Sequence, residues 1–170
     1  EVIEDYSGSV QIYDSNSDFY YQPYRRGREF FQREYRLGED NRVVHELSYQ
    51  VDFIVGSGSN NRSYISERNG SLYEMPLTWY SELGIWDLSP GYAEQNLRFS
   101  RPIVPECMNC HNSYVEHQPF SESHYVSVPF GIGCERCHGP GKIHASYKGE
   151  SGQAGGEIVN PSRLPSLRQM

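Results

Sequence analysis

The sequence contains the pattern Cys-x-x-Cys-His twice, at residues 107–111 and 134–138, here called the first and the second motif. This pattern is typical of proteins that attach c-type haem covalently. Each thiol adds to one of the two vinyl groups at one porphyrin edge, and the histidine that follows binds the iron. We therefore predict two c-type haems. The residues expected to hold them are Cys107, Cys110, Cys134 and Cys137 through thioethers, and His111 and His138 as proximal iron ligands.

A zinc ribbon and a disulfide scaffold are the alternatives for four cysteines. A ribbon would use the four thiolates and would leave both histidines without a role, and the 23 residues between the two cysteine pairs lie just outside the usual ribbon spacing. Disulfide scaffolds are typically short and rich in cysteine, whereas this chain has 4 cysteines in 170 residues. The sequence favours haem over both.

The ligand on the opposite face of each iron decides what a haem can do. A second protein ligand favours electron transfer, and an open position permits small-molecule chemistry. More histidines lie outside the motifs than two irons need, which favours bis-histidine ligation. The distal candidates are His45, His117, His124 and His144, with the methionines Met75, Met108 and Met170 as further candidates.

His144 is the first choice among the distal candidates. It lies six residues after His138, in a stretch that contains Gly139, Pro140 and Gly141. So short a stretch does not easily pass round the edge of its own haem, so we predict that His144 binds the iron held by His111.

The distal ligand of the other iron stays open among several candidates. His117 lies six residues after His111, which mirrors the spacing between the second motif and His144. His124 lies in a polar, serine-rich stretch, and His45 lies at the start of an expected strand. A ligand from outside this chain is the remaining alternative.

The composition is unusual for a globular chain. The mean hydropathy is -0.71, and there are 14 tyrosines but few aliphatic residues with which to build a core. Two porphyrins would supply apolar surface against which aromatic side chains can pack.

The charge and the hydropathy pattern exclude some partners. A net charge of -7 with a pI near 5.3 argues against nucleic acid and against an anionic membrane surface. No stretch approaches 18 consecutive apolar residues, so no transmembrane segment is predicted. Because c-type haem is attached outside the bacterial cytoplasm, we expect an exported, periplasmic or extracellular chain in mature or processed form, cut from a longer polypeptide.

Residues before the motifs carry strand signals. Alternating apolar and polar residues predict strands near 9–13 and 31–37, and a further run extends from 43 to 55. The clearest hairpin pairs 64–68 with 71–75 across Asn69-Gly70, the dipeptide preferred in a type I′ turn. Pro76 is expected to end the second of these strands.

The fold class is therefore a mainly β N-terminal part followed by a C-terminal dihaem segment of low regular structure, with short helical turns at the motifs. The predicted regions are 1–100 (β-rich), 101–148 (dihaem) and 149–170 (a Gly/Pro-rich tail or linker). Residues 56–61 are expected to form a plain loop, since the further glycine and helix of a nucleotide-binding loop are absent. Trp79 and Trp86 are expected to pack in a core.

The stretch 131–141, together with His144, resembles bacterial multihaem cytochromes c related to the cytochrome c554 group. Residues 49–58, 62–64, 77–80 and 86–92 resemble a β-rich insert that such proteins carry before this haem pair. The resemblance implies periplasmic or extracellular electron transfer, bis-histidine haems and a distal role for His144. Such proteins carry further haem motifs upstream of this region and more cysteines soon after the Asn-Pro segment at 160–161, and this chain has neither.

The sequence thus favours an electron carrier, not an enzyme, with closely spaced bis-histidine haems. Its expected partners are redox proteins, either other multihaem cytochromes or copies of itself in a homo-oligomer or a conductive filament. The alternative is a redox enzyme that reduces a small nitrogen or sulfur oxyanion, or a peroxide, at an open haem with His45, Arg62 or Tyr64 as distal groups. A structural or sensory haem module is a third alternative.

Overall fold

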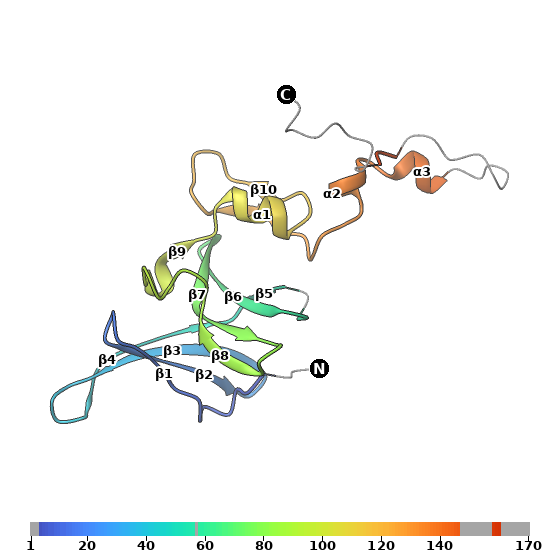
Figure 1. Cartoon of the computed structure of the whole chain (residues 1–170). Coiled ribbons are helices and arrows are strands. Elements are labelled where there is room, and N and C mark those ends of the chain that lie inside the picture. The colour runs from blue at the N-terminus through green and yellow to red at the C-terminus, as the bar shows by residue number, and fades with distance from the viewer. Residues whose placement is uncertain (1–3, 57, 147–157, 161–170) are drawn as a thin grey trace.

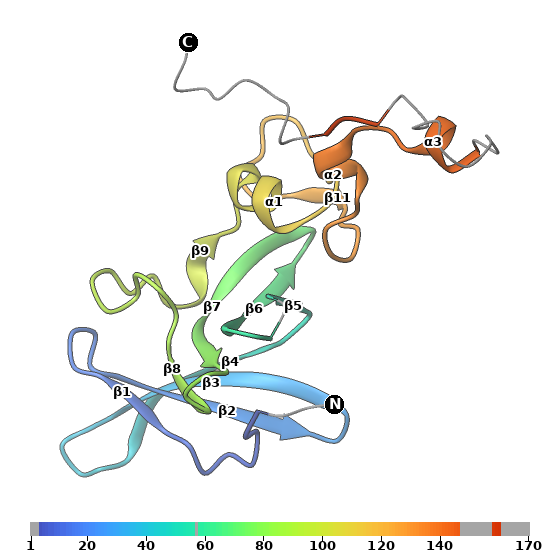
Figure 2. The ribbon, with the colours of Figure 1, turned by 45° about the vertical axis from the view of Figure 1, so that its right-hand side comes forward.

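The computed structural model describes residues 4–56, 58–146 and 158–160. In Figure 2 the first sheet lies at the bottom, the second sheet lies above it, and the helices of the two motifs lie at the top. The chain is mainly β, as predicted. The strands and helices are β1 (Ile12–Asp14), β2 (Phe19–Arg26), β3 (Glu29–Leu37), β4 (Val43–Gln50), β5 (Phe53–Val55), β6 (Asn61–Arg68), β7 (Ser71–Tyr80), β8 (Ile85–Leu88), the 3-10 helix η1 (Arg98–Ser100), β9 (Arg101–Pro102), α1 (Pro105–His111), β10 (Glu116–His117), β11 (Tyr125–Ser127), α2 (Glu135–His138) and α3 (Lys142–Ser146).

The first sheet is an antiparallel meander in the order β1-β2-β3-β4. Side chains alternate between its two faces, and the buried pairs Tyr21–Glu34 and Pro23–Gln32 of β2 and β3 share one face. The sequence analysis missed β2, which contains Pro23. This proline is tolerated because β1 pairs only with residues 19–21 of β2, so its missing N–H removes no ladder bond on that side.

The second sheet has the order β5-β6-β7-β8, and β9 pairs with β7 (Figure 1). The predicted hairpin is confirmed, since Asn69 and Gly70 have φ angles of 53° and 82° between β6 and β7. The expectation that Pro76 ends its strand is wrong, because β7 runs on to Tyr80. Pro76 lies beside the register shift between Ser63 and Ile65 of β6, where no regular ladder bond is required of it.

The core lies between the two sheets. Gln32 of β3 is fully buried, donating from Nε2 to the Leu77 carbonyl and accepting from the Leu77 N–H, both at 2.9 Å. This side chain therefore links β3 to β7 as a neighbouring strand would. Both tryptophans are buried in this core, as expected. The buried core residues are Tyr6, Phe19, Tyr21, Tyr64, Met75, Leu77, Trp79, Trp86 and Phe99.

A buried carboxylate lies beside this core. Glu34 of β3 accepts hydrogen bonds from Tyr21 and from the guanidinium of Arg98, and His45 Nε2 lies 3.0 Å from its Oε1. Partners on several sides satisfy the oxygens of this carboxylate, as a buried charge requires.

The segment with the motifs is joined to the end of the second sheet. The Leu72 N–H donates to the Ser123 carbonyl and the Tyr125 N–H to the Gly70 carbonyl, both at 2.9 Å. The Tyr125 hydroxyl donates to the Ile103 carbonyl at 2.7 Å. These bonds attach the β10–β11 hairpin to the start of β7 and to Ile103, two residues before α1. Residue 100, the predicted boundary, is the last residue of η1, directly before β9.

Most of the predicted tail, 149–157 and 161–170, lies outside the described residues. Within the described part, no helix is both long and apolar enough to cross a membrane.

Candidate haem-binding site

The first motif forms the helix α1, which confirms the expected helical turn. Pro105 begins the helix, where a backbone N–H would have no partner within the helix, so its missing N–H costs nothing. Glu106 lies in the first turn, where a negative charge is favoured by the helix dipole. Cys107 and Cys110 are three residues apart and His111 is four residues after Cys107, so all three share one helix face. Both cysteines are free and exposed.

Met108 fixes the orientation of that face. Its side chain is only 3% exposed and packs in a second core cluster with Ile65, Leu72, Ile103 and Tyr125. Met108 lines both cavities beside His111, so its burial holds the histidine of the first motif near the end of the second sheet.

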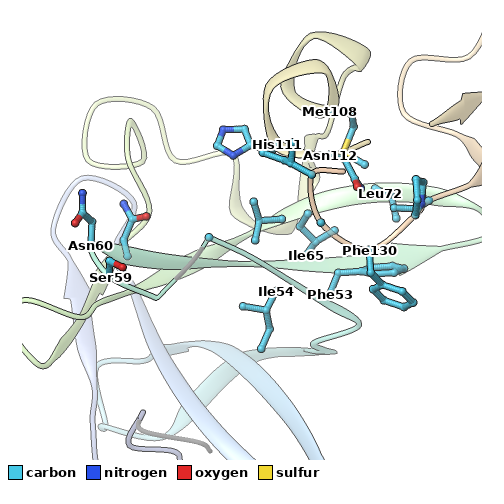
Figure 3. A pocket seen from close by; sticks show the side chains of 17 residues that line it. Phe53, Ile54, Ser59, Asn60, Ile65, Leu72, Met108, His111, Asn112 and Phe130 are labelled. Carbon is cyan, nitrogen blue, oxygen red and sulfur yellow. The ribbon is translucent and has the colours of Figure 1, made fainter. Parts of the chain in front are cut away.

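A cavity of about 590 Å³ adjoins His111. His111 lies on one side of it, and Phe53, Ile54 and Ile65 of β5 and β6 lie on the other (Figure 3). Ser59 and Asn60 stand at one end and Phe130 at the other. Most of the wall is apolar, and Ile54 and Phe130 are exposed, as suits a site for an apolar disc.

A smaller cavity of about 140 Å³ also adjoins His111 and Cys107. Its wall contains Val55, Ile65, Ile103 and one carboxylate, that of Glu74 on β7. Glu74 pairs with Arg101 at 3.1 Å, and burial raises the pKa of its carboxyl above the ordinary value.

The second motif forms the short helix α2, which has no buried residue. Cys134 and Cys137 are free and exposed. The Nδ1 atom of His138 lies 2.8 Å from the Val159 carbonyl, and the Val159 N–H donates to the His138 carbonyl at 2.9 Å. A carbonyl oxygen only accepts, so Nδ1 carries the proton and Nε2 keeps a lone pair for a metal.

A cavity of about 360 Å³ lies beside the second motif, with Cys134, His138, His144 and Ile158 in its wall. The sequence argument assigned His144 to the iron of the first motif, whereas the structure places it at the cavity of the second. The turn between α2 and α3 explains this position. Gly139 has a φ of 73°, and the Gly141 N–H donates to Glu135 Oε1 at 2.6 Å, so the residue before α3 is bonded to the first turn of α2.

The other distal candidates lie away from these cavities. His117 contacts Ser121 through Nε2 at 3.2 Å and packs edge-on against Tyr125. His124 lies against Gly70, where an added Cβ would meet its ring at 2.3 Å. His45 lies in the first sheet with Glu34 and Arg98.

The methionine candidates and the distal groups of the enzyme alternative are also placed. Met75 is fully buried between the sheets, and Met170 lies outside the described residues. Arg62 and Tyr64 both bind the Glu4 carboxylate, at 2.7 Å and 2.9 Å, so they belong to a cluster that does not include His45.

The x residues of both motifs have structural roles that the sequence analysis missed. Met108 anchors α1, Glu135 holds the turn to α3, and Arg136 donates to the Asn109 carbonyl of the first motif from Nε at 2.9 Å and Nη2 at 2.7 Å. No local sequence signal marks these roles, because each depends on a partner that folding brings near.

These residues fit a c-type haem. Each motif has two free thiols and one imidazole, of which the histidine and the first cysteine line a cavity with largely apolar walls, and His138 has the tautomer that iron ligation needs. The fold and the site are those of a β-rich protein in which two motif helices carry the residue types that c-type haem attachment requires.

A family model described as cytochrome c554 and c-prime matches residues 92–139, a span that includes both motifs. No curated protein and no solved structure matches the chain. The match supports a relationship to cytochrome c554, and with it covalent c-type haem and haem-based electron transfer.

Proposed function

We propose that this chain is a dihaem electron carrier with one c-type haem at each motif. The observation that carries the proposal is that the two motifs are bonded directly to each other, and that in each the histidine and the first cysteine line a cavity. When bound, c-type haem supplies one-electron transfer at its iron. The protein holds the two rings at a fixed separation and excludes water from part of their edges.

His144 is proposed as a distal iron ligand. Its place in the same cavity wall as His138 favours the iron of the second motif over that of the first. Among the described residues, no second histidine lines the two cavities beside His111. His117, His124, His45 and a histidine from another chain therefore stay proposals for the first iron.

The proposed function has consequences for the location of the protein and for its redox partners. Cytochromes c are typically exported proteins, so we propose a periplasmic or extracellular location. The net charge of -7 favours docking to basic surfaces of redox partners. A polymer in which neighbouring copies continue the chain of haems is the extended form of the proposal.

Haem counting and carbon monoxide titration test the proposal. The chain is produced with a c-type haem attachment system, and intact mass together with the pyridine haemochrome spectrum should give two haems. Carbon monoxide should leave the Soret band of the reduced protein unchanged, because both irons are six-coordinate. A Soret shift for half the haem or more would contradict the pure carrier and support the alternative, reduction of a small oxyanion or peroxide at an open iron.

A further inference from the structure

The contact between Arg136 and Asn109 joins the two motifs directly. The guanidinium of Arg136 donates twice to one acceptor, the Asn109 carbonyl oxygen, at 2.9 Å and 2.7 Å. Asn109 lies in the last turn of α1, where carbonyls have no partner within the helix. A cation at this end is also favoured by the helix dipole. Arg136 therefore caps the C-terminus of the other motif's helix.

Further contacts surround this bond. The Gly133 N–H donates to Ser113 Oγ at 2.6 Å, and the Ser113 N–H donates to the Gly131 carbonyl at 2.9 Å. The guanidinium carbon of Arg136 lies 5.3 Å from the centre of the Tyr114 ring, a cation–π arrangement. Together these contacts hold α2 against the C-terminal end of α1.

The bond between Arg136 and Asn109 lies next to the cysteines that are proposed to hold the two haems. Asn109 directly precedes Cys110, and Arg136 directly precedes Cys137, so the bond joins the residues beside the second cysteine of each motif. Those cysteines are the proposed thioether positions. A change in the separation of the two backbones here would move one porphyrin edge relative to the other.

We propose that Arg136 is a positioning residue that sets the geometry between the two haems. The inference rests on the proposed function, since it requires a haem at each motif. Two donors on one planar group and the ring of Tyr114 define a direction as well as a distance, which a lysine ammonium does not reproduce. Haem-to-haem electron transfer depends on this geometry, so Arg136 acts on it without touching either iron.

The test compares Arg136→Gln and Arg136→Lys with the native holoprotein. Arg42→Gln is the matched control, because Arg42 is exposed in the first sheet's last hairpin and the change removes the same charge. The readout is the split Soret signal in circular dichroism, which depends on the relative orientation of two nearby haems. Intact mass gives the number of attached haems, and thermal unfolding gives the stability.

Loss of the split signal in both Arg136 variants, with two haems attached and with Arg42→Gln unchanged, is the expected result. An unchanged split in Arg136→Gln would overturn the inference and leave the proposed function standing. A native signal in Arg136→Lys would also overturn it, since charge alone would then suffice. Absence of haem from the native protein would overturn the inference and the proposed function together.

Discussion

The two motifs share a sequence pattern but are held in different ways. The first is anchored by Met108 in a core cluster that also contains strand residues, and β5 and β6 form the wall opposite its histidine. The second has no buried residue in its helix and is held by hydrogen bonds, which Glu135 accepts from Gly141, Arg136 donates to Asn109, and the Val159 carbonyl accepts from His138. The first site is thus shaped by the fold, whereas the second depends on bonds made by the motif itself.

The cavity walls show the same difference. The wall of the first site combines residues from 53–65, from Leu72 and from 128–132, which are far apart in the sequence. The wall of the second comes from residues 134–145 and Ile158. The first cavity is thus built by several parts of the fold, while the second is built almost entirely by the segment that contains its own motif.

Removing the cysteines of one motif at a time should show the difference between the two sites most clearly. Cys134→Ala with Cys137→Ala should halve the haem content and raise amide exchange across α2 and α3, yet leave the unfolding of the sheets unchanged. Cys107→Ala with Cys110→Ala should lower the unfolding temperature of the sheets as well, because the emptied cavities border β5 to β7. Pyridine haemochrome spectra, hydrogen exchange and thermal circular dichroism measure these effects. Equal effects of the two double variants on the sheets would contradict the comparison.

Met108→Ala should destabilise the fold by about 2–5 kcal/mol, the usual cost of emptying a buried methionine site. Leu83→Ala is the control, because Leu83 is exposed at the β7–β8 turn and should change stability by less than about 0.5 kcal/mol. Urea unfolding of both variants gives the comparison. If the two variants matched, α1 would not be anchored through Met108.

Glu135→Ala should act only on the second site. The change removes the acceptor of the Gly141 N–H, a charge-assisted bond at an exposed position, at a cost of about 1 kcal/mol. The resulting freedom of α3 should loosen His144 and alter the electron paramagnetic resonance of one iron. Glu116→Ala on β10 is the control. A changed spectrum of both irons would show that the two sites are not held independently.

The smallest expected effect is the contribution of Glu74, beside the first motif, to the pH dependence of the free energy of unfolding. Burial raises the pKa of its carboxyl above 4.5, so the folded state holds this proton more tightly than the unfolded state. Its contribution to stability is fully present below the unfolded pKa and is lost as the pH rises through the folded pKa, with a slope of at most about 1.4 kcal/mol per pH unit.

The neutral variant Glu74→Gln should lack this slope, which urea unfolding at acidic and neutral pH would reveal. Glu67→Gln, on the neighbouring strand β6, serves as the control. Parallel stability curves for the native protein and Glu74→Gln would show that the carboxyl titrates as it does in water.

Local chemistry made part of this structure predictable from the sequence. The motif spacing predicts the two short helices, and Asn69-Gly70 predicts the β6–β7 hairpin, because both depend on residues close in the chain. The sequence analysis missed β2 and the second half of β7, because Pro23 and Pro76 disfavour strands. Both prolines are tolerated where they stand, since the strand pairing requires no backbone N–H from them.

The candidate site divides in the same way. Its cysteines and proximal histidines follow from the pattern, whereas the wall residues and the link between the motifs do not. Arg136 and Asn109 are 27 residues apart, and nothing near either residue specifies the other as a partner. The assignment of His144 to the iron of the first motif stays a prediction, and the bond from the Gly141 N–H to Glu135, which holds the residue before α3 near the second motif, has no local sequence signal.

The link made by Gln32 has a consequence for which substitutions the fold can accept. Its amide must donate to one backbone group and accept from another on the same residue, Leu77. Glutamate has almost the same shape, but in its charged form it offers two acceptors, and one would face the Leu77 carbonyl across a dry contact. Glutamate would therefore keep both bonds only in its protonated form, and a smaller apolar residue would leave both Leu77 groups without a partner, so shape alone would misjudge tolerance.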